Sequence, residues 1–450
     1  MLKKILCALL LFSIGVQSQN TITGKLSPKN DLLTIVILYQ LNGAKQVYIS
    51  NSKIDNEQFK MEIPKGNPSG MYRLSFNTAI PGYIDFLFDQ EDVQLKFDPL
   101  NILNSLEFLN SEENKIYANF LKESTKEQQK LDSLQIVFFG LKDKKQDEIT
   151  ADFYAKYLNH YTKLQTEYDH KTIGKLANHF IKSEQKYYAP TLFVSPQKYL
   201  NSVKQHFFDF INFEDNVLKK ANFFGQKAIE YVFYLNISDD FEVQNMLYKN
   251  AVNELMQKVG ENDEVKSEIL TSLIYAFEQY ENLNLAGFVI DDFYNKLPAS
   301  YKNEKLIAEM KSKIKLAVGN KAPEITWEEN GSQKKISTFN VNGAENYVLV
   351  FWSTSCSHCL NEIPKLYEFS KDSEAIHVIA VALENNKAGF EQYASKFTSW
   401  TNILGLKKWE NEMAKEYEIN ATPTYFILDK DKKIIAKPLH FDDIKAFFEN

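Results

Sequence analysis

The sequence is poor in two residue types that mark well-known classes of function. It has only three cysteines, and Arg73 is the only arginine among 52 basic residues in a chain of 450. Proteins that read base edges or grip phosphates rely on the forked guanidinium group, which lysine does not replace. The formal net charge is −7. Nucleic acid is therefore not expected as a partner.

Long apolar runs are absent after the first residues. Two lysines precede an apolar stretch at residues 5–16, and the small residues up to Ser18 suit a signal peptidase. That stretch is shorter than the ~20 residues that span a bilayer. Cys7 lies inside it, whereas a lipoprotein needs its cysteine just after it. We expect residues 1–19 to be a cleaved signal peptide, and the mature protein to be exported without a stable membrane span.

The other two cysteines form a single motif, Cys356-Ser357-His358-Cys359. It follows directly on the apolar run at residues 347–352, so we expect a strand that delivers it to the first turn of a helix. Without a second C-x-x-C or a suitably spaced histidine, a zinc site is disfavoured. A disulfide that closes so short a loop adds little stability. The motif therefore predicts thiol–disulfide exchange, with no metal and no cofactor beyond a redox-active Cys356–Cys359 disulfide.

The position of each residue in the motif suggests its role. Unpaired N–H groups and the helix dipole stabilise a thiolate at Cys356, which we expect to be the nucleophile. Cys359, one turn further on, should be more buried and resolve the mixed disulfide. Glu362 lies three residues after Cys359 on the same helical face, where it can exchange a proton with that thiol. The alternative is that Glu362 takes no part in catalysis and lies near the start of the helix only because the helix dipole favours an acidic residue there.

His358 bears on the direction of electron flow. A histidine just before the second cysteine can add positive charge or a hydrogen bond to the Cys356 thiolate. Stabilising the reduced form makes a dithiol pair more oxidising. His358 therefore favours a higher reduction potential.

The length suggests about three domains. Period-two alternation with turn signals predicts an antiparallel β sandwich at residues 20–105, and helical stripes predict an all-α region at 106–316. Phe207, Phe208, Phe210 and Phe213 in that region indicate either a helical core or an aromatic ligand groove. Alternating strand and helix signals predict an α/β domain at 317–450.

The C-terminal residues 315–450 resemble the thioredoxin superfamily, and within it the TlpA/ResA branch of exported reductases. The marks that carry the resemblance are Trp352 four before Cys356, Pro364 five past Cys359, Thr422-Pro423-Thr424 where the family has its cis-proline loop, Gly319, Ala322 and Pro323 as the G-x-x-A-P entrance, and Glu362 at the acidic position. One position departs from thioredoxins proper, which have a buried aspartate where this chain has Val350. That leaves Glu362 as the only evident carboxylate for proton transfer.

The resemblance implies a thioredoxin fold in which Trp352, Thr422 and a cis Pro423 contact the substrate. It also implies a reductase of protein disulfides in the periplasm or envelope of a Gram-negative bacterium, with cytochrome c maturation as one possible role. The partners would be protein thiols and disulfides and an upstream envelope electron donor. The residues before 315 resemble the N-terminal extensions of TlpA-like proteins from Bacteroidetes.

Other functions stay open at this point. A disulfide-forming oxidase or isomerase uses the same chemistry, and His358 favours it. A partner-binding envelope protein with a redox switch is another alternative. A peroxidase of the peroxiredoxin type is disfavoured, because Leu349 stands where that family needs a proline. The sequence names neither the substrate nor the oligomeric state.

Overall fold

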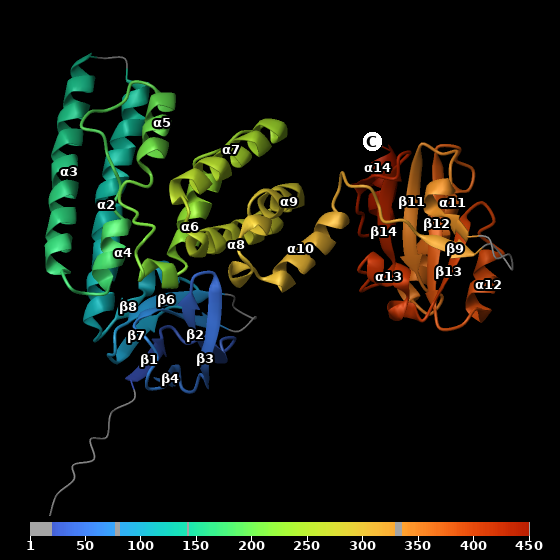
Figure 1. Cartoon of the computed structure of the whole chain (residues 1–450), viewed down its shortest axis with the longest axis horizontal. Coiled ribbons are helices and arrows are strands. Elements are labelled where there is room, and N and C mark those ends of the chain that lie inside the picture. Colours follow the sequence, from blue (N-terminus) through green and yellow to red (C-terminus); the bar gives the residue numbers. More distant parts are fainter. Residues whose placement is uncertain (1–19, 77–81, 142–143, 329–334, 450) are drawn as a thin grey trace, which may run out of the picture. The chain divides into compact units, whose positions relative to one another are not determined.

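A computed structural model describes residues 20–76, 82–141, 144–328 and 335–449. The predicted signal peptide at residues 1–19 lies outside the described residues. The chain divides into two compact units, residues 1–276 with 297–301 and residues 277–296 with 302–450. Figure 1 labels many of the helices and strands of both units.

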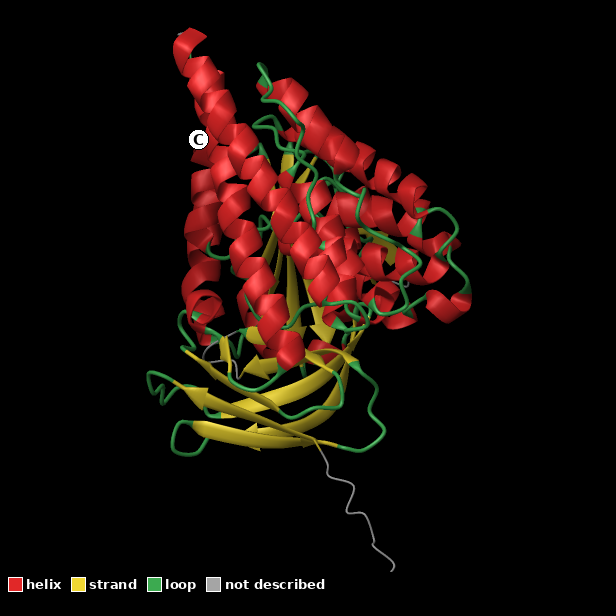
Figure 2. Ribbon diagram, turned by 90° about the vertical axis from the view of Figure 1, so that its left-hand side faces the viewer, coloured by secondary structure: helices red, strands yellow, loops and turns green. Residues whose placement is uncertain are grey.

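The first unit begins with two four-stranded sheets that enclose one apolar core, seen as yellow strands in the lower part of Figure 2. Their orders are β4-β1-β7-β8 and β3-β2-β5-β6. The strands are β1 (Asn20–Leu26), β2 (Ile35–Asn42), β3 (Lys45–Lys53), β4 (Gln58–Ile63), β5 (Gly70–Phe76), β6 (Tyr83–Phe88), β7 (Val93–Phe97) and β8 (Glu107–Phe108). The predicted sandwich is confirmed.

One strand pair departs from the expected antiparallel arrangement. β1 and β7 run parallel, with Ile22 opposite Val93 and Leu26 opposite Phe97. The chain forms β2 to β6 before β7 returns to the free side of β1 in the same direction. A period-two pattern shows which face of a strand is buried but not which neighbour it pairs with.

Helices make up the rest of the first unit. They are α1 (Ile102–Ser105), α2 (Glu112–Gly140), α3 (Lys144–Lys171), α4 (Ala177–Ser183), α5 (Pro196–His206), η1 (Leu218–Lys220), α6 (Phe223–Ile229), the π-helix η2 (Glu230–Tyr234), α7 (Phe241–Val259), most of α8 (Asp263–Gln279) and η4 (Ala299–Tyr301). The predicted helical stripes at 131–138, 153–164 and 265–277 fall in α2, α3 and α8, which confirms the helical region.

The run of phenylalanines in this region forms a packed cluster. The ring of Phe208 lies 4.8 Å from the rings of both Phe207 and Tyr231, and Phe213 lies 5.4 Å from Phe224. Phe207, Phe208 and Phe213 are half-buried and lie in the turns after α5, and Phe207 lines a cavity of the helical region, so the helical core and the aromatic groove both stay predictions. Phe210 is the exception, with 38% of its surface exposed.

The second unit contains the end of α8, the helices α9 (Leu283–Asp292), η3 (Tyr294–Lys296) and α10 (Glu304–Lys315), and an α/β layer. The main sheet has the order β13-β12-β11-β14-β15. β11 (Asn346–Trp352), β12 (Ile376–Glu384) and β13 (Thr401–Leu406) are parallel, whereas β14 (Thr424–Asp429) and β15 (Ile434–Ala436) add antiparallel pairs. β9 (Thr326–Glu328) and β10 (Lys335–Ser337) form a separate ribbon.

The central strand β11 is buried on both faces. Val348, Val350 and Trp352 pack in one core with residues of α11 (Ser357–Ser370) and α14 (Phe441–Glu449), while Tyr347 and Phe351 face the other core. The second core contains residues of α13 (Glu412–Glu416), and the connections also include η5 (Thr338–Asn340), α12 (Ala388–Ala394) and η6 (Lys408–Glu410). This arrangement confirms the predicted thioredoxin fold and fixes the strand end that leads to the cysteines.

Candidate active site

Cys356 caps the helix that follows strand β11. Its Sγ accepts a hydrogen bond of 3.3 Å from the Cys359 backbone N–H, and its thiol donates to the Thr422 carbonyl oxygen 3.1 Å away. Cys356 is half-buried, whereas Cys359, one turn into α11, has no exposed surface. The structure therefore has one reachable and one buried sulfur, as expected.

The surroundings move the pKa values of the two cysteines in opposite directions. Burial raises the pKa of Cys356, but hydrogen bonds with the Cys359 thiol and with the backbone N–H groups of Cys359 and His358 outweigh it, and the pKa is lowered. Burial raises the pKa of Cys359 to about 12, and its hydrogen bond with Cys356 adds to the rise. Both residues are free thiols here. A thiolate therefore forms first at Cys356.

His358 is exposed at the first turn of α11. Its backbone N–H is one of the groups that lower the pKa of Cys356. No hydrogen bond or ion pair of its imidazole is found among the residues that the structure describes. The contribution of the imidazole stays a prediction, and the backbone supplies a second way in which position 358 acts on Cys356.

Glu362 lies one turn after Cys359, with 16% of its side chain exposed. Its Oε2 accepts hydrogen bonds from the Tyr425 hydroxyl at 2.9 Å and from the Phe441 backbone N–H at 3.2 Å. Its Oε1 is 3.5 Å from Nδ1 of His440. The carboxylate is thus held in one orientation by groups from β14 and from the start of α14.

Sequence reasoning missed Tyr425, which is 1% exposed and packs in the same core as Cys359. Burial raises the pKa of Tyr425 far above its ordinary range, and Glu362, Cys359 and Cys356 add to the rise. The Tyr425 hydroxyl therefore interacts electrostatically with the Glu362 carboxylate and with both cysteine sulfurs. In the sequence Tyr425 looks like any apolar strand residue, so no local signal could have identified it.

The loop before β14 faces Cys356. The Thr422–Pro423 peptide bond is cis, as expected, and the Thr422 carbonyl accepts the hydrogen bond from the Cys356 thiol. Thr422 and Pro423 are both half-buried. Their contact with a substrate strand stays a prediction.

Trp352 lies in the core, with 1% of its surface exposed. Its ring contacts those of Tyr393 and Phe397 at centroid distances of 5.7 and 6.1 Å. Its proposed role in substrate contact is not tested by this position. The exposed tryptophan beside Cys356 is instead Trp409, which sequence reasoning missed.

A small cavity of about 170 Å³ opens beside Cys356. It is lined by Ser353, Ser355, Cys356, Leu383, Lys408, Trp409 and Thr422. Lys408 Nζ donates a hydrogen bond of 2.9 Å to the Ser355 hydroxyl. The end of β11, the loop before β14 and η6 thus meet at the reactive sulfur.

Glu384 is a second carboxylate that the sequence reasoning missed. It ends β12 and is 6% exposed. Its Oε1 accepts hydrogen bonds from the Thr354 backbone N–H and, at 3.2 Å, from the Ser353 hydroxyl. It therefore fixes the loop that leads to Cys356. The signal was present, because a charged residue at the carboxyl end of a parallel strand lies beside its neighbour's carboxyl end.

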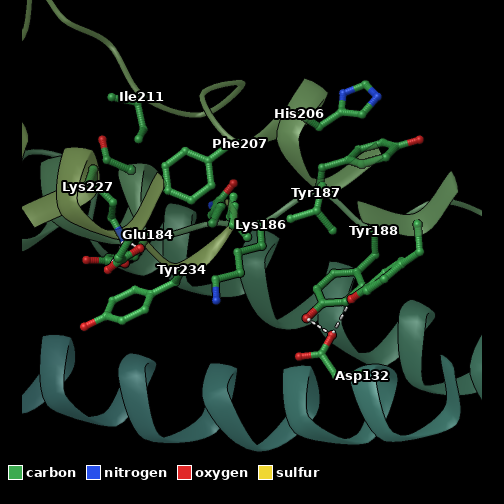
Figure 3. Close-up of a pocket in the computed structure, with 16 residues that line it drawn as sticks. Asp132, Glu184, Lys186, Tyr187, Tyr188, His206, Phe207, Ile211, Lys227 and Tyr234 are labelled. Carbon is green, nitrogen blue, oxygen red and sulfur yellow. Dashed lines mark hydrogen bonds and ion pairs between the residues drawn. The ribbon is translucent and has the colours of Figure 1, made fainter. Parts of the chain in front are cut away.

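A larger cavity, of about 370 Å³, lies in the helical region of the first unit. Figure 3 shows Lys227 beside Glu184, and Tyr188 above Asp132. Lys227 Nζ is 2.7 Å from Glu184 and 3.1 Å from Glu230, and the Tyr188 hydroxyl donates to Asp132 over 3.1 Å. These internal pairs satisfy much of the polar lining, and none of the cysteine-site residues contributes to it.

Two further features concern metals and membranes. Within residues 20–449 as far as they are described, no group of three or more histidine, cysteine, aspartate or glutamate residues is arranged to hold a metal ion. None of the described helices combines the length and the apolar character needed to cross a bilayer.

Comparison with known proteins places the similarity in the C-terminal α/β layer. Residues 343–434 match the family described as thioredoxin-like. A thioredoxin-like protein of Haemophilus influenzae is 34% identical over 90 residues, which are 19% of this chain and 49% of that protein. The thiol-disulfide oxidoreductase ResA of Bacillus cereus is 28% identical over 135 residues, 28% of this chain and 71% of that protein.

Solved structures match as well. The thioredoxin domain of a thiol-disulfide oxidoreductase from Bacteroides vulgatus is 26% identical, with a TM-score of 0.25, and covers 29% of this chain and 98% of that one. A thioredoxin-like protein from Bacteroides caccae is 15% identical, with a TM-score of 0.29, and covers 59% and 97%. The chain spans about half the length of the Haemophilus relative. The α/β layer that carries the Cys356–Cys359 site is therefore a thioredoxin-like domain, and it is similar to the ResA thiol-disulfide oxidoreductases.

Proposed function

We propose that this chain is a thiol–disulfide oxidoreductase that acts on protein disulfides through Cys356 and Cys359. The observation that carries the proposal is the split between the sulfurs: Cys356 is reachable with a lowered pKa, and Cys359 is buried with a pKa of about 12. The thiolate is the attacking species in disulfide exchange. The name of the Bacillus cereus relative, a thiol-disulfide oxidoreductase, supports the same activity.

The reaction has two exchange steps. The Cys356 thiolate attacks one sulfur of the partner disulfide, and the other partner sulfur leaves as a thiolate. Cys359 then loses its proton and attacks Sγ of Cys356, which releases the partner sulfur that had been joined to Cys356. Two electrons pass to the partner, the two thiol protons end on its two sulfurs, and the protein is left with a Cys356–Cys359 disulfide.

The second step needs a base, because the pKa of Cys359 is about 12. Glu362 is the proposed acceptor of that proton, on the same face of α11 as Cys359. The hydrogen bonds from Tyr425 and from the Phe441 N–H make these two residues positioning groups for the carboxylate. The proton then passes to the departing sulfur of the partner.

We assign the chain to the reductases of the cell envelope. Its resemblance to the TlpA/ResA branch supports this direction, with cytochrome c maturation as the proposed process and an upstream envelope protein as the electron donor. The apolar stretch at residues 5–16 supports export to the periplasm of a Gram-negative bacterium. The alternative direction, disulfide formation, is favoured by His358, because stabilising the reduced pair raises its potential.

Reduction of insulin disulfides by the full mature chain, with dithiothreitol as electron donor, tests the proposal. Cys356→Ser should abolish the reaction, and Cys359→Ser should accumulate a mixed disulfide with the partner. Wild-type activity in Cys356→Ser would overturn the proposal. Equilibration with glutathione tests the direction of electron flow, since a reduction potential of about −270 mV supports a reductase and one of about −120 mV an oxidase.

A further inference from the structure

The cavity beside Cys356 contains a cation that the exchange reaction does not use. Among the described residues that line it, Lys408 provides the only ammonium group. Lys408 is half-buried, and its Nζ donates to the Ser355 hydroxyl over 2.9 Å. No ion pair of Lys408 is found in the part of the chain that the structure describes. Because an ammonium group has three donors, two are left for a ligand.

Glu384, the buried carboxylate that accepts a hydrogen bond from Ser353 of the cavity lining, does not neutralise the charge of Lys408. Glu384 is linked to it only through two hydroxyls, since Ser353 donates to Glu384 and lies 3.0 Å from Ser355. The Thr354 backbone N–H also donates to Glu384. Glu384 is therefore hydrogen-bonded without a direct contact to Lys408, whose positive charge stays available to the cavity.

The backbone at this position is unusual. Lys407 and Lys408 have φ angles of +75° and +47°, in the left-handed region that side chains other than glycine rarely adopt. Such conformations persist where surrounding structure enforces them, often at functional sites. Here Lys407 follows β13 and Lys408 begins η6, and this turn brings Lys408 to Ser355 in the loop before Cys356.

Trp409 supplies the other wall of the cavity. It is 46% exposed, while Leu383 at the inner side is 1% exposed. An aromatic face and an aliphatic floor suit the short carbon chain that joins a sulfur to an acidic group. The lining therefore has a reactive sulfur, an apolar wall and a cation.

We propose that Lys408 and Trp409 form a carboxylate-binding subsite beside Cys356, so that the preferred substrates are disulfides with an acidic group close to the attacked sulfur. This inference rests on the proposed function. The chemistry is the exchange described above: the Cys356 thiolate joins the carboxylate-bearing sulfur, the second substrate sulfur leaves, and Cys359 then releases the first. Lys408 holds the carboxylate of the half that is joined to Cys356, and takes no part in bond changes.

A series of small disulfides that differ in charge tests the subsite with the reduced full chain. The anionic probes are dithiodiglycolate, 3,3′-dithiodipropionate and 4,4′-dithiodibutyrate, which place the carboxylate at increasing reach. Bis(2-hydroxyethyl) disulfide is the neutral probe and cystamine the cationic one. Each rate is divided by the rate of the same disulfide with dithiothreitol, which removes differences in intrinsic reactivity.

Lys408→Gln is the test variant, and Lys407→Gln is its control with the same charge change one residue away. We expect Lys408→Gln to lower the anionic-to-neutral rate ratio for at least one probe by about threefold, the size of a partly exposed ion pair. The ratio should change little in Lys407→Gln, and the wild-type preference should weaken at high salt.

Each outcome separates the subsite from the proposed function. One outcome is that the neutral disulfide is reduced while the wild type, Lys408→Gln and Lys407→Gln have the same anionic-to-neutral rate ratio for every probe. That result would overturn the proposed subsite and leave the oxidoreductase proposal standing. If both variants lower the ratio equally, general surface charge is responsible and the subsite is again wrong. If no disulfide reacts with the wild-type chain, the proposed function fails, and the subsite fails with it.

Discussion

The Tyr425 hydroxyl donates a hydrogen bond of 2.9 Å to the Glu362 carboxylate, and so joins the strand after the cis Thr422–Pro423 bond to the helix that bears both cysteines. Burial and Glu362 are the main causes of the raised pKa of Tyr425, and negative charge on Cys359 and Cys356 raises that pKa further. Negative charge that develops on a cysteine sulfur therefore interacts electrostatically with Tyr425, the residue that orients Glu362, the proposed proton acceptor.

Glu362→Gln should slow resolution of the mixed disulfide by about 100-fold, the usual contribution of a positioned acid–base group, and leave the first attack by Cys356 unchanged. Single-turnover kinetics with a chromogenic disulfide, such as 5,5′-dithiobis(2-nitrobenzoate), resolve the two steps. Tyr425→Phe should slow the same step less, because the carboxylate remains but loses one of its positioning hydrogen bonds.

The double variant serves as the control for this pathway. If Tyr425 acts only through Glu362, then Glu362→Gln combined with Tyr425→Phe should resolve no more slowly than Glu362→Gln alone. Additive effects would show that Tyr425 acts separately. An unchanged pH–rate profile for resolution in Glu362→Gln would remove the carboxylate from the mechanism.

The candidate site was predictable from sequence where its parts are close along the chain. The N-cap and first two turns of one helix contain Cys356, Cys359 and Glu362. Their spacing in the sequence therefore fixes their relative positions. Lys408 and Tyr425 reach the site only through the register of neighbouring strands and the loops after them. Their own sequence surroundings are those of a lysine-rich turn and an apolar strand, which give no local signal.

The fold shows the same division. Period-two and helical patterns identified the sandwich, the helical stripes and the α/β layer, because burial of one face dictates those periods. The parallel β1–β7 pair was not predicted, since pairing depends on where the chain returns. Within the stripes some apolar residues are exposed, such as Val137 at 52% and Phe153 at 49%, because a periodic pattern does not show where a packing partner ends.

The reduced protein should lose stability at alkaline pH because of Cys359. Its folded pKa of about 12 exceeds the ~8.5 of an unfolded thiol, so the folded state holds a proton that the unfolded state releases. The contribution of Cys359 to the free energy of unfolding is fully present below pH ~8.5. It is lost as the pH rises toward 12, by at most about 1.4 kcal/mol per pH unit.

Urea denaturation of the reduced wild type and of Cys359→Ala at several pH values measures this contribution as a difference, which cancels the titration of lysines and tyrosines. The gap between wild type and variant should narrow above pH ~8.5. A gap that stays constant up to pH 11 would contradict the raised pKa of Cys359.

Lys227 should be a stability determinant of the helical region. Its side chain is 9% exposed and contacts both Glu184 and Glu230, so Lys227→Met would leave two carboxylates without their cation. Because Glu184 and Glu230 keep 22% and 41% of their side chains exposed, we expect a cost above the ~1 kcal/mol of surface pairs and below the ~3 kcal/mol of fully buried ones. The exposed Lys171–Glu167 pair provides the control, since Lys171→Met should cost less than about 1 kcal/mol. Hydrogen exchange of the α4 and α6 amides measures both, and equal losses would contradict the assignment.

Position 358 acts on Cys356 through two groups that a pair of variants can separate. His358→Ala removes the imidazole and keeps the backbone N–H, whereas His358→Pro removes both, at a first-turn position where proline is tolerated. Since the N–H of residue 358 lowers the pKa of Cys356, its loss should destabilise the thiolate and make the reduction potential more negative. We expect a shift of about 30 mV for His358→Pro, which corresponds to about 1.4 kcal/mol for two electrons, and a smaller one for His358→Ala.

Glutathione equilibration measures the reduction potentials of both variants. If His358→Pro changes the potential by less than about 10 mV, neither group sets it; if both variants shift it equally, the imidazole acts and the N–H does not.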